Sequence, residues 1–292
     1  MTPGRQDDMM QAAIIGAGLI GHSWAVVVAR AGHRAVLHDA DAGALSTAPG
    51  RIARALADLD GNGLLDEPAD AVAARIAITP DLEEAIAGAA VVHECVPEDL
   101  SVKRQMFARL DAAAAPGTIL ASATSTIPAS AFTEGLAGRE RCIIVHPSTP
   151  PHILPLVEIC PAPWTSAATT DRTVDFVSRL GQVPSLVRRE VDGFILNRLQ
   201  AAVVCEAFRL WEDGYASAAD IEATVRETLG MRWALMGPFE TISLNAPNGL
   251  VDYLSRFGDL FYRINSTQQA RPFDMQAVRR LEEERLASGL DA

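Results

Sequence analysis

The sequence predicts an α/β fold: a Rossmann-type, doubly wound and mostly parallel sheet followed by an all-helical C-terminal domain. Three observations predict it. Short apolar runs alternate with Ala-rich helical stretches through the first two-thirds of the 292 residues. A glycine-rich turn, Gly16-Ala-Gly18-Leu-Ile-Gly21, joins the first apolar run to the first helical stretch. From about Asp192 onward no strand is obvious and long helical patterns take over.

Each predicted strand is a short apolar run bounded by turn residues or by a helical stretch. The predicted strands cover 12–15, 34–38, 74–78, 90–94, 118–121, 142–145 and 156–159. The first predicted helix covers 19–31 and stops at Gly32. In the C-terminal part, helices are predicted over 194–213, 218–229, 250–264 and 275–286, with Gly230 capping the second of these.

The length fits two domains, which we place at 1–190 and 191–292. The first ten residues are polar and do not read as a signal peptide, so we expect a loose leader. No apolar run reaches the roughly 18 residues that span a bilayer. A formal net charge of -12, without a Lys/Arg block, argues against nucleic acid or anionic membrane as partners.

The four cysteines are widely spaced and form no CxxC or Cys/His set, and the six histidines are scattered. We therefore expect no metal site and no disulfide, and a reducing cytoplasm fits this cysteine usage.

The glycine-rich turn Gly16–Gly21 has the spacing of a dinucleotide-binding loop. At the start of a helix, the backbone at Leu19 and Ile20 can face a pyrophosphate, which the positive end of the helix dipole also attracts. Asp39 closes the second predicted strand, where a carboxylate binds the adenosine ribose. Because a carboxylate repels a 2′-phosphate and Ala40 follows it, the cofactor is expected to be NAD. The alternative is a structural turn with a solvated aspartate.

One histidine stands where a catalytic base is needed. Oxidation of an alcohol requires a group that takes the hydroxyl proton, and histidine titrates near neutral pH. His146 follows the predicted strand 142–145, and strand ends of this kind form the ligand crevice of a parallel sheet. Glu158 lies twelve residues later, where a returning strand could bring it beside His146. Ser125 follows another predicted strand and could donate a hydrogen bond to the reacting oxygen.

These motifs together resemble the 3-hydroxyacyl-CoA dehydrogenase family, over essentially the whole chain after about residue 11. The resemblance implies that His146 is the catalytic histidine, Glu158 its partner and Ser125 the active-site serine. It also implies that Asn197, in the segment 193–198, binds substrate. The alternatives are a structural role for His146 and a helix-capping or bridging role for Asn197.

The segment 96–103 resembles the part of that family whose Glu and Lys approach the nicotinamide half of NAD. The resemblance implies this role for Glu98 and Lys103, and an ordinary surface pair is the alternative. His152, in the loop after His146, is expected only to line the site.

Two segments depart from the acyl-CoA pattern of the family. His146-Pro-Ser-Thr-Pro150 replaces the usual His-Phe-Phe-Asn-Pro, and 230–241 lacks the usual Gly-Tyr-Pro stretch. Both look like the λ-crystallin branch, which includes L-gulonate 3-dehydrogenase and acts on a free hydroxy acid. The stretch 58–70 carries five carboxylates and no lysine, which disfavours CoA phosphates there. Arg232 could hold a substrate carboxylate instead; the alternative for Arg232 and Trp233 is a helix-terminal ion pair with core packing.

The sequence thus predicts an NAD-dependent oxidoreductase that oxidises the 3-hydroxyl of a small, L-gulonate-like L-3-hydroxy acid, with a small molecule as substrate. A homodimer through the helical domain is expected. The alternatives are a short-chain L-3-hydroxyacyl-CoA dehydrogenase, a carnitine-type 3-dehydrogenase and a crystallin-like structural or NAD-sensing protein. The carnitine alternative needs an aromatic cage, and only 5% of the residues are aromatic.

Overall fold

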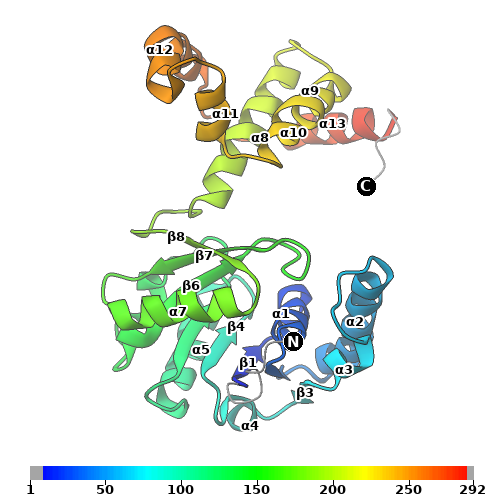
Figure 1. Ribbon diagram of the computed structural model, residues 1–292, viewed down its shortest axis with the longest axis vertical. Helices are drawn as coiled ribbons and strands as arrows, with labels where there is room; N and C mark the ends of the chain where they lie inside the picture. Colours follow the sequence, from blue (N-terminus) through cyan, green and yellow to red (C-terminus); the bar gives the residue numbers. More distant parts are fainter. Residues whose placement is uncertain (1–8, 288–292) are drawn as a thin grey trace. The chain divides into compact units, whose positions relative to one another are not determined.

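The computed structural model describes residues 9–287, so most of the predicted leader lies outside the described residues. The chain divides into two compact units, residues 1–198 and 199–292. The first unit is built on one sheet in the order β3-β2-β1-β4-β5-β6-β7-β8, with β7 antiparallel to β6 and the other neighbours parallel (Figure 1). Its strands are β1 (Gln11–Ile15), β2 (Arg34–His38), β3 (Ile76–Thr79), β4 (Val91–Glu94), β5 (Ile119–Ser122), β6 (Cys142–Pro147), β7 (Leu156–Pro161) and β8 (Val183–Leu186).

Helices cover both faces of this sheet, as in a doubly wound fold. They are α1 (Leu19–Arg30), α2 (Ala42–Gly61), α3 (Ala69–Ala73), α4 (Leu82–Ile86), α5 (Leu100–Ala113), α6 (Ser130–Thr133), η1 (Arg139–Arg141) and α7 (Ala167–Arg179). Alternate strand residues point to opposite faces, so each strand feeds two core layers. One layer packs against α1, α2 and α7, the other against α4, α5 and α6.

Local capping fixes where several of these helices begin. The carboxylate of Asp41 accepts from the backbone of Gly43 at α2, and that of Asp99 accepts from Val102 at α5. Such caps satisfy backbone N–H groups that the first turn leaves without partners. The start of α5 is thereby set only a few residues after the end of β4, which matters for the site.

The second unit contains only helices among its described residues. They are α8 (Leu196–Glu212, which begins in the first unit), α9 (Ala218–Thr224), η2 (Val225–Gly230), α10 (Met231–Trp233), α11 (Pro238–Leu244), α12 (Gly249–Thr267) and α13 (Met275–Ala287). None of the helices within residues 9–287 is long and apolar enough to cross a membrane.

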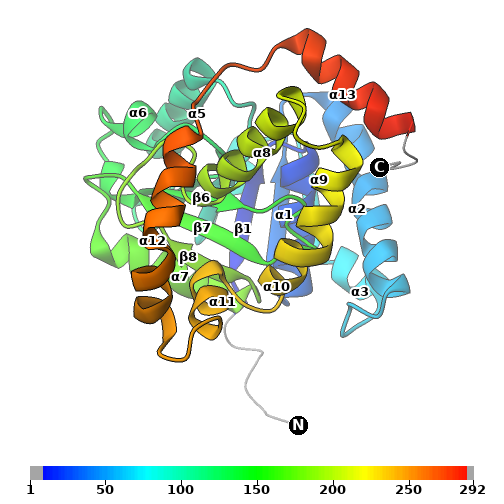
Figure 2. The same cartoon turned by 90° about the horizontal axis from the view of Figure 1, so that it is seen from above.

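The predicted fold class is confirmed, with several local errors. Strand β8 was not predicted, because Val183-Pro-Ser-Leu186 is short and contains proline. The third strand was predicted two residues too early. Gly230 does not cap a helix: its backbone is helical, and α9, η2 and α10 follow one another without a break (Figure 2).

Candidate active site

The glycine-rich turn lies where the strand order reverses, between β1 and β4. A Cβ atom on Gly16, whose φ is +112°, would lie 2.6 Å from the carbonyl oxygen of Cys95 just after β4. A Cβ on Gly21 would overlap the carbonyl oxygen of Gly16, whereas one on Gly18 would meet no protein atom within 4 Å. The absence of a Cβ at Gly16 and Gly21 permits tight packing, and the exposed Gly18 leaves the backbone open to a ligand. This geometry fits the pyrophosphate of a dinucleotide at the start of α1.

Asp39 directly follows β2 and lies beside this turn. One carboxylate oxygen accepts from the backbone of Ala17 at 2.7 Å, and the other accepts from Asp41 at 2.9 Å. The side chain is half-buried, so it fixes the turn and still exposes oxygen lone pairs. Its position fits the ribose of the adenosine half.

His146 and Glu158 are paired across two antiparallel strands. They occupy opposite positions in the β6–β7 register, and His146 Nδ1 lies 2.8 Å from a carboxylate oxygen of Glu158. Both side chains are buried, at 6% and 1% exposure. A carboxylate on Nδ1 holds the imidazole in the tautomer whose Nε2 is free to take a proton.

The second oxygen of Glu158 accepts two backbone hydrogen bonds, from Ile195 at 2.7 Å and Leu196 at 2.8 Å, where α8 begins. Burial raises the pKa of Glu158, but the hydrogen bonds from His146 and from these two amides outweigh it and lower the pKa below its usual value. The carboxylate therefore stays charged beside the imidazole.

A strained segment precedes α8. Gly193 has a φ of +75° and Phe194 a φ of +50°, a region that bulky residues rarely adopt. Phe194 is fully buried, and its ring centre lies 5.6 Å from that of His146. Such strain is typical of functional sites, where the surrounding structure enforces it. Here the turn at Gly193 and Phe194 directs the backbone amides of Ile195 and Leu196 toward Glu158.

Ser125 and Asn197 are also brought together. Asn197, in the first turn of α8, donates from Nδ2 to the backbone carbonyl of Ser125 at 2.8 Å. Ser125 is exposed on the loop after β5. The Asn197 side chain therefore does not cap its own helix. It bridges to the loop that carries Ser125, which is the bridging role named as an alternative above.

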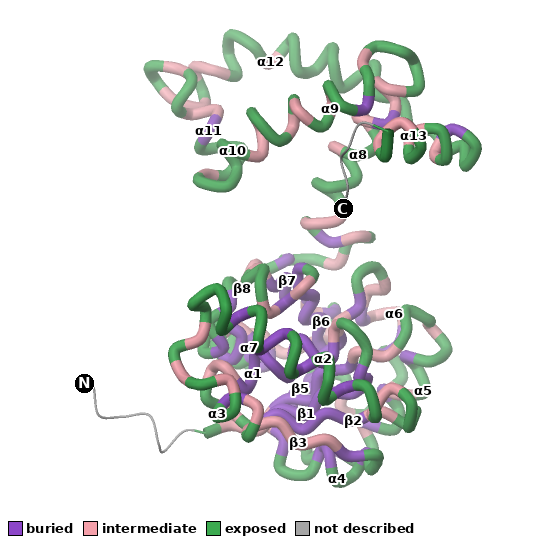
Figure 3. The backbone as a smooth tube through the Cα atoms, turned by 90° about the vertical axis from the view of Figure 1, so that its right-hand side faces the viewer, coloured by how far each residue is buried: buried purple, intermediate pink, exposed green. Residues whose placement is uncertain are grey.

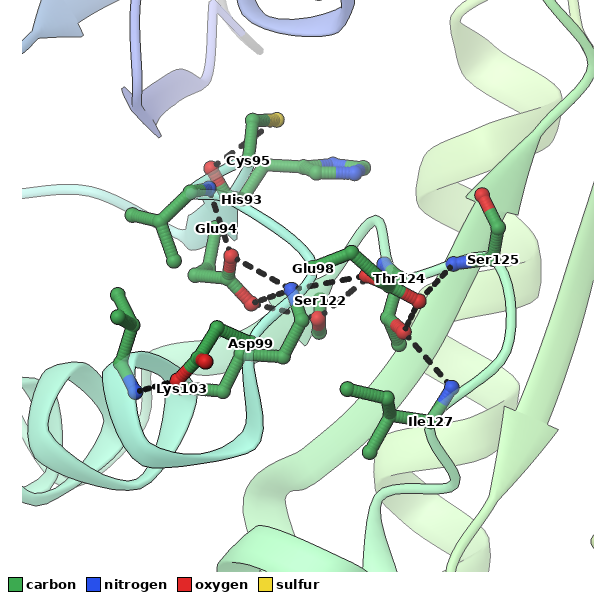
Figure 4. A network of polar contacts seen from close by, with 12 residues as sticks. His93, Glu94, Cys95, Glu98, Asp99, Lys103, Ser122, Thr124, Ser125 and Ile127 are labelled. Carbon is green, nitrogen blue, oxygen red and sulfur yellow. Dashed lines mark hydrogen bonds and ion pairs between the residues drawn. The ribbon is translucent and has the colours of Figure 1, made fainter.

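Glu98 and Lys103 belong to a polar network that also contains Glu94, a residue that the sequence did not single out (Figure 4). Glu94 and Lys103 are buried, whereas Glu98 is 39% exposed. Lys103 is 1% exposed, so the alternative of an ordinary surface pair is wrong. Its ammonium lies 3.0 Å from a carboxylate oxygen of Glu94 and 3.5 Å from one of Glu98. A carboxylate at the end of an apolar strand needs a partner, and that signal could have identified Glu94.

Glu98 in turn holds the loop that carries Ser125. One of its oxygens accepts from the Ser125 amide, from the Thr124 hydroxyl, and from both the amide and the hydroxyl of Thr126. Burial raises the pKa of Glu98, but these hydrogen bonds and the Lys103 ammonium outweigh it and lower the pKa.

A pocket of about 470 Å³ lies between α1, α2 and the loop after β6. His22, Arg51, Arg54, Asp58 and His152 are among the residues that line it. Of the acidic stretch 58–70, only Asp58 reaches this pocket, where two arginines outnumber it. The carboxylates of that stretch therefore disfavour phosphates in this pocket less than the sequence suggests. His152 lines this pocket, and its predicted place in the site around His146 stays a prediction.

Arg232 lies in the helical unit, on α10. Its side chain and that of Trp233 are exposed, and Arg232 has no ion pair with any residue in 9–287. The alternative of a helix-terminal ion pair with core packing is thus not found among the described residues.

Comparison with known proteins gives the family. Residues 11–191 match the NAD binding domain of 3-hydroxyacyl-CoA dehydrogenase, and residues 193–281 match its C-terminal domain. A lambda-crystallin homolog of Bos taurus is 42% identical over 257 residues, 87% of this chain and 80% of that protein. An L-carnitine dehydrogenase of Streptomyces griseus is 37% identical over 258 residues, 88% of this chain and 76% of that protein.

Among solved structures, 5-formyl-3-hydroxy-2-methylpyridine 4-carboxylic acid 5-dehydrogenase, an NAD+ dependent dismutase, superposes with a TM-score of 0.79. It shares 28% sequence identity, and the match covers 91% of this chain and 84% of that one. With both domains matched in order, the protein is an NAD-dependent oxidoreductase that belongs to the 3-hydroxyacyl-CoA dehydrogenase family.

Proposed function

We propose that the protein oxidises the 3-hydroxyl of a small, free L-3-hydroxy acid of the L-gulonate type, with His146 as the general base. The observation that carries the proposal is the buried pair of His146 and Glu158, joined at 2.8 Å. A histidine with a charged carboxylate on Nδ1 can accept a proton at Nε2 and keep the resulting imidazolium stabilised.

The other polar groups of the site have positioning roles in this proposal. The hydroxyl of Ser125 donates to the reacting oxygen. Asn197 binds substrate, and its side-chain amide also fixes the Ser125 loop by donating to the backbone carbonyl of Ser125. NAD, when bound, accepts the hydride that leaves the substrate carbon. A general base of this kind contributes about 10²–10⁴-fold to the rate.

For the cofactor, the proposal assigns the pyrophosphate to the turn Gly16–Gly21 with the amides of Leu19 and Ile20, and the ribose to Asp39. Gly18 is the open position of the turn. Glu98 faces the nicotinamide half of the cofactor. Lys103 orients the Glu98 carboxylate, because its buried ammonium lies 3.5 Å from a Glu98 oxygen. The proposed NAD preference follows from the charge of Asp39, which repels a 2′-phosphate.

A free acid is supported by the relatives and by one residue of the helical unit. The names of the carnitine dehydrogenase and of the pyridine carboxylic acid dehydrogenase specify acids without CoA. We also propose Arg232 as the residue that binds the substrate carboxylate, because its guanidinium is exposed and a carboxylate suits it in bidentate geometry.

A substrate panel tests this proposal. L-gulonate, L-3-hydroxybutyrate, L-carnitine and 3-hydroxybutyryl-CoA are each offered with saturating NAD+, and NADH absorbance is followed. The proposal expects turnover of L-gulonate or another short L-3-hydroxy acid with the highest kcat/KM of the panel. Efficient oxidation of the thioester with inert free acids would contradict the substrate assignment. Absence of turnover with every compound would likewise contradict the proposed substrate class.

The thioester remains a second candidate, because the pocket beside α2 presents Arg51 and Arg54 against a single carboxylate, Asp58. Two guanidinium groups can bind phosphates. If a CoA thioester is the substrate, Arg54→Met raises its KM and leaves the KM of free acids unchanged.

The proposal includes a cytoplasmic homodimer formed through the helical unit. Five large apolar side chains along one side of α12 are between 41% and 47% exposed. No residue of α12 is buried (Figure 3). The five side chains are Leu254, Phe257, Leu260, Phe261 and Ile264. A continuous exposed apolar face favours burial against a partner, here a second copy of the chain. The proposed cytoplasmic location has separate support, because the four free cysteines suit a reducing compartment. Sedimentation of a monomer at micromolar concentration would contradict the dimer.

A further inference from the structure

We propose that Glu94 is a positioning residue of the active site: it fixes the Ser122–Thr126 segment, which carries Ser125, by two separate routes. The inference rests on the proposed function for the role of Ser125, but the placement of the segment can be tested without it. Glu94 ends β4 and is completely buried, beside the turn that leads to Glu98.

The first route is direct. One oxygen of Glu94 accepts a 2.5 Å hydrogen bond from the hydroxyl of Ser122, the last residue of β5. The Ser122 oxygen then accepts from the backbone of Thr124 at 3.3 Å. Glu94 thus fixes the point at which the segment leaves the sheet.

The second route passes through a buried cation. The Lys103 ammonium lies 3.0 and 3.2 Å from the two oxygens of Glu94 and 3.5 Å from the free oxygen of Glu98. The other oxygen of Glu98 accepts four hydrogen bonds from the segment, at 2.6 to 3.0 Å, two of them from the amides of Ser125 and Thr126. Glu94 therefore fixes the Lys103 ammonium (Figure 4). The ammonium orients the Glu98 carboxylate, which in turn binds the Ser122–Thr126 segment.

Both routes end on the same segment, Ser122–Thr126, so Glu94 fixes it at two separate points. Burial raises the pKa of Glu94, and the Lys103 ammonium and the Ser122 hydroxyl oppose that rise. A buried ion pair of this kind is weak evidence for stability, because well-packed neutral residues often replace one without loss. Its geometric effect is different, since neutral side chains would not orient Glu98.

The test is amide hydrogen exchange at Ser125 and Thr126 in the cofactor-free protein, resolved by NMR. The main variant is Glu94→Gln, which keeps the shape and one oxygen acceptor but removes the charge. The second variant is Glu94→Gln/Lys103→Met, which removes both buried charges together and so protects the fold. We expect exchange at both amides to rise about tenfold or more in each variant, because local opening of the segment becomes easier.

The matched control is Asp111→Asn/Arg141→Met. It removes another largely buried ion pair, at 2.9 Å, whose acidic member also lies on α5. Exchange at Ser125 and Thr126 should stay at the wild-type rate there, even if the melting temperature falls. Unchanged exchange in the Glu94 variants, or an equal rise in the control, would overturn the inference.

Substrate kinetics separate this inference from the proposed function. Faster exchange with kcat reduced about tenfold supports both, with NAD+ affinity measured by calorimetry in parallel. Faster exchange with unchanged kcat keeps Glu94 as the residue that fixes the segment and removes Ser125 from the chemistry.

Discussion

The side-chain amide of Asn197 donates a 2.8 Å hydrogen bond to the backbone carbonyl of Ser125, 72 residues earlier in the chain. The preceding residue, Leu196, donates its backbone N–H to Glu158, the partner of His146. The first turn of α8 therefore joins the serine loop to the histidine–carboxylate pair, and four separate sequence motifs become one connected site.

This link predicts the effect of Asn197→Asp. The substitution is isosteric but places a carboxylate oxygen against the Ser125 carbonyl, so attraction becomes repulsion. We expect kcat/KM to fall about tenfold or more, since losing a hydrogen bond and leaving its partner unsatisfied costs roughly 1–3 kcal/mol. Steady-state kinetics measure it, with Asn265→Asp on the exposed α12 as a control for added charge. Activity within twofold of wild type would remove Asn197 from the site.

Asp39→Asn tests the proposed basis of cofactor choice. The asparagine keeps an oxygen that can accept from the Ala17 amide, so the glycine turn should survive. Its lost charge should lower the ratio of the NADP+ to NAD+ dissociation constants about tenfold, because repulsion of the 2′-phosphate is relieved. Calorimetry with both cofactors measures the ratio. Comparable affinities already in the wild type would refute the role of Asp39.

His93 predicts an acid-sensitive fold. Its ring packs against that of Trp24 at a tilt of 37°, with the ring centres 4.3 Å apart, and burial lowers its pKa from 6.5 to about 3. Between pH 6.5 and about 3 the unfolded chain binds a proton that the folded chain does not, so stability falls as the pH drops through this window. His93→Phe keeps a ring beside Trp24 and cannot titrate.

Denaturant unfolding of both proteins across this window gives the comparison. The wild type should lose stability relative to His93→Phe by about 1.4 kcal/mol per pH unit. Parallel curves for the two proteins would show that His93 titrates normally in the folded state.

Arg232→Met tests the proposed carboxylate contact. If Arg232 binds the substrate acid, KM for that acid should rise roughly 10- to 150-fold, since a hydrogen bond to a charged group is worth about 1.5–3 kcal/mol. NAD+ affinity should not change. Arg226→Met removes another exposed arginine of the same unit and serves as the control. An unchanged KM would leave the substrate carboxylate without its proposed partner.

Local patterns predicted much of this fold because its strands are short apolar runs, bounded by turn residues and alternating with helical stretches, as in a buried parallel sheet. The sequence could also predict His146 and Glu158, since a twelve-residue return between two strands brings their ends together. Glu94 escaped prediction because its partners, Lys103 and Ser122, come from two other elements. Phe194 escaped for a similar reason: its left-handed backbone is imposed by packing, against its own preference.

The proposed role of His146 as the general base can be tested with His146→Gln. NADH formation is measured for wild type and variant at saturating NAD+ with the best free acid of the panel, and NAD+ binding is measured by calorimetry on both. We expect kcat to fall about 10²–10⁴-fold while the NAD+ dissociation constant stays near its wild-type value, because the base acts on the substrate hydroxyl. A variant that keeps more than about a tenth of the wild-type kcat, far above what loss of a general base allows, would contradict it.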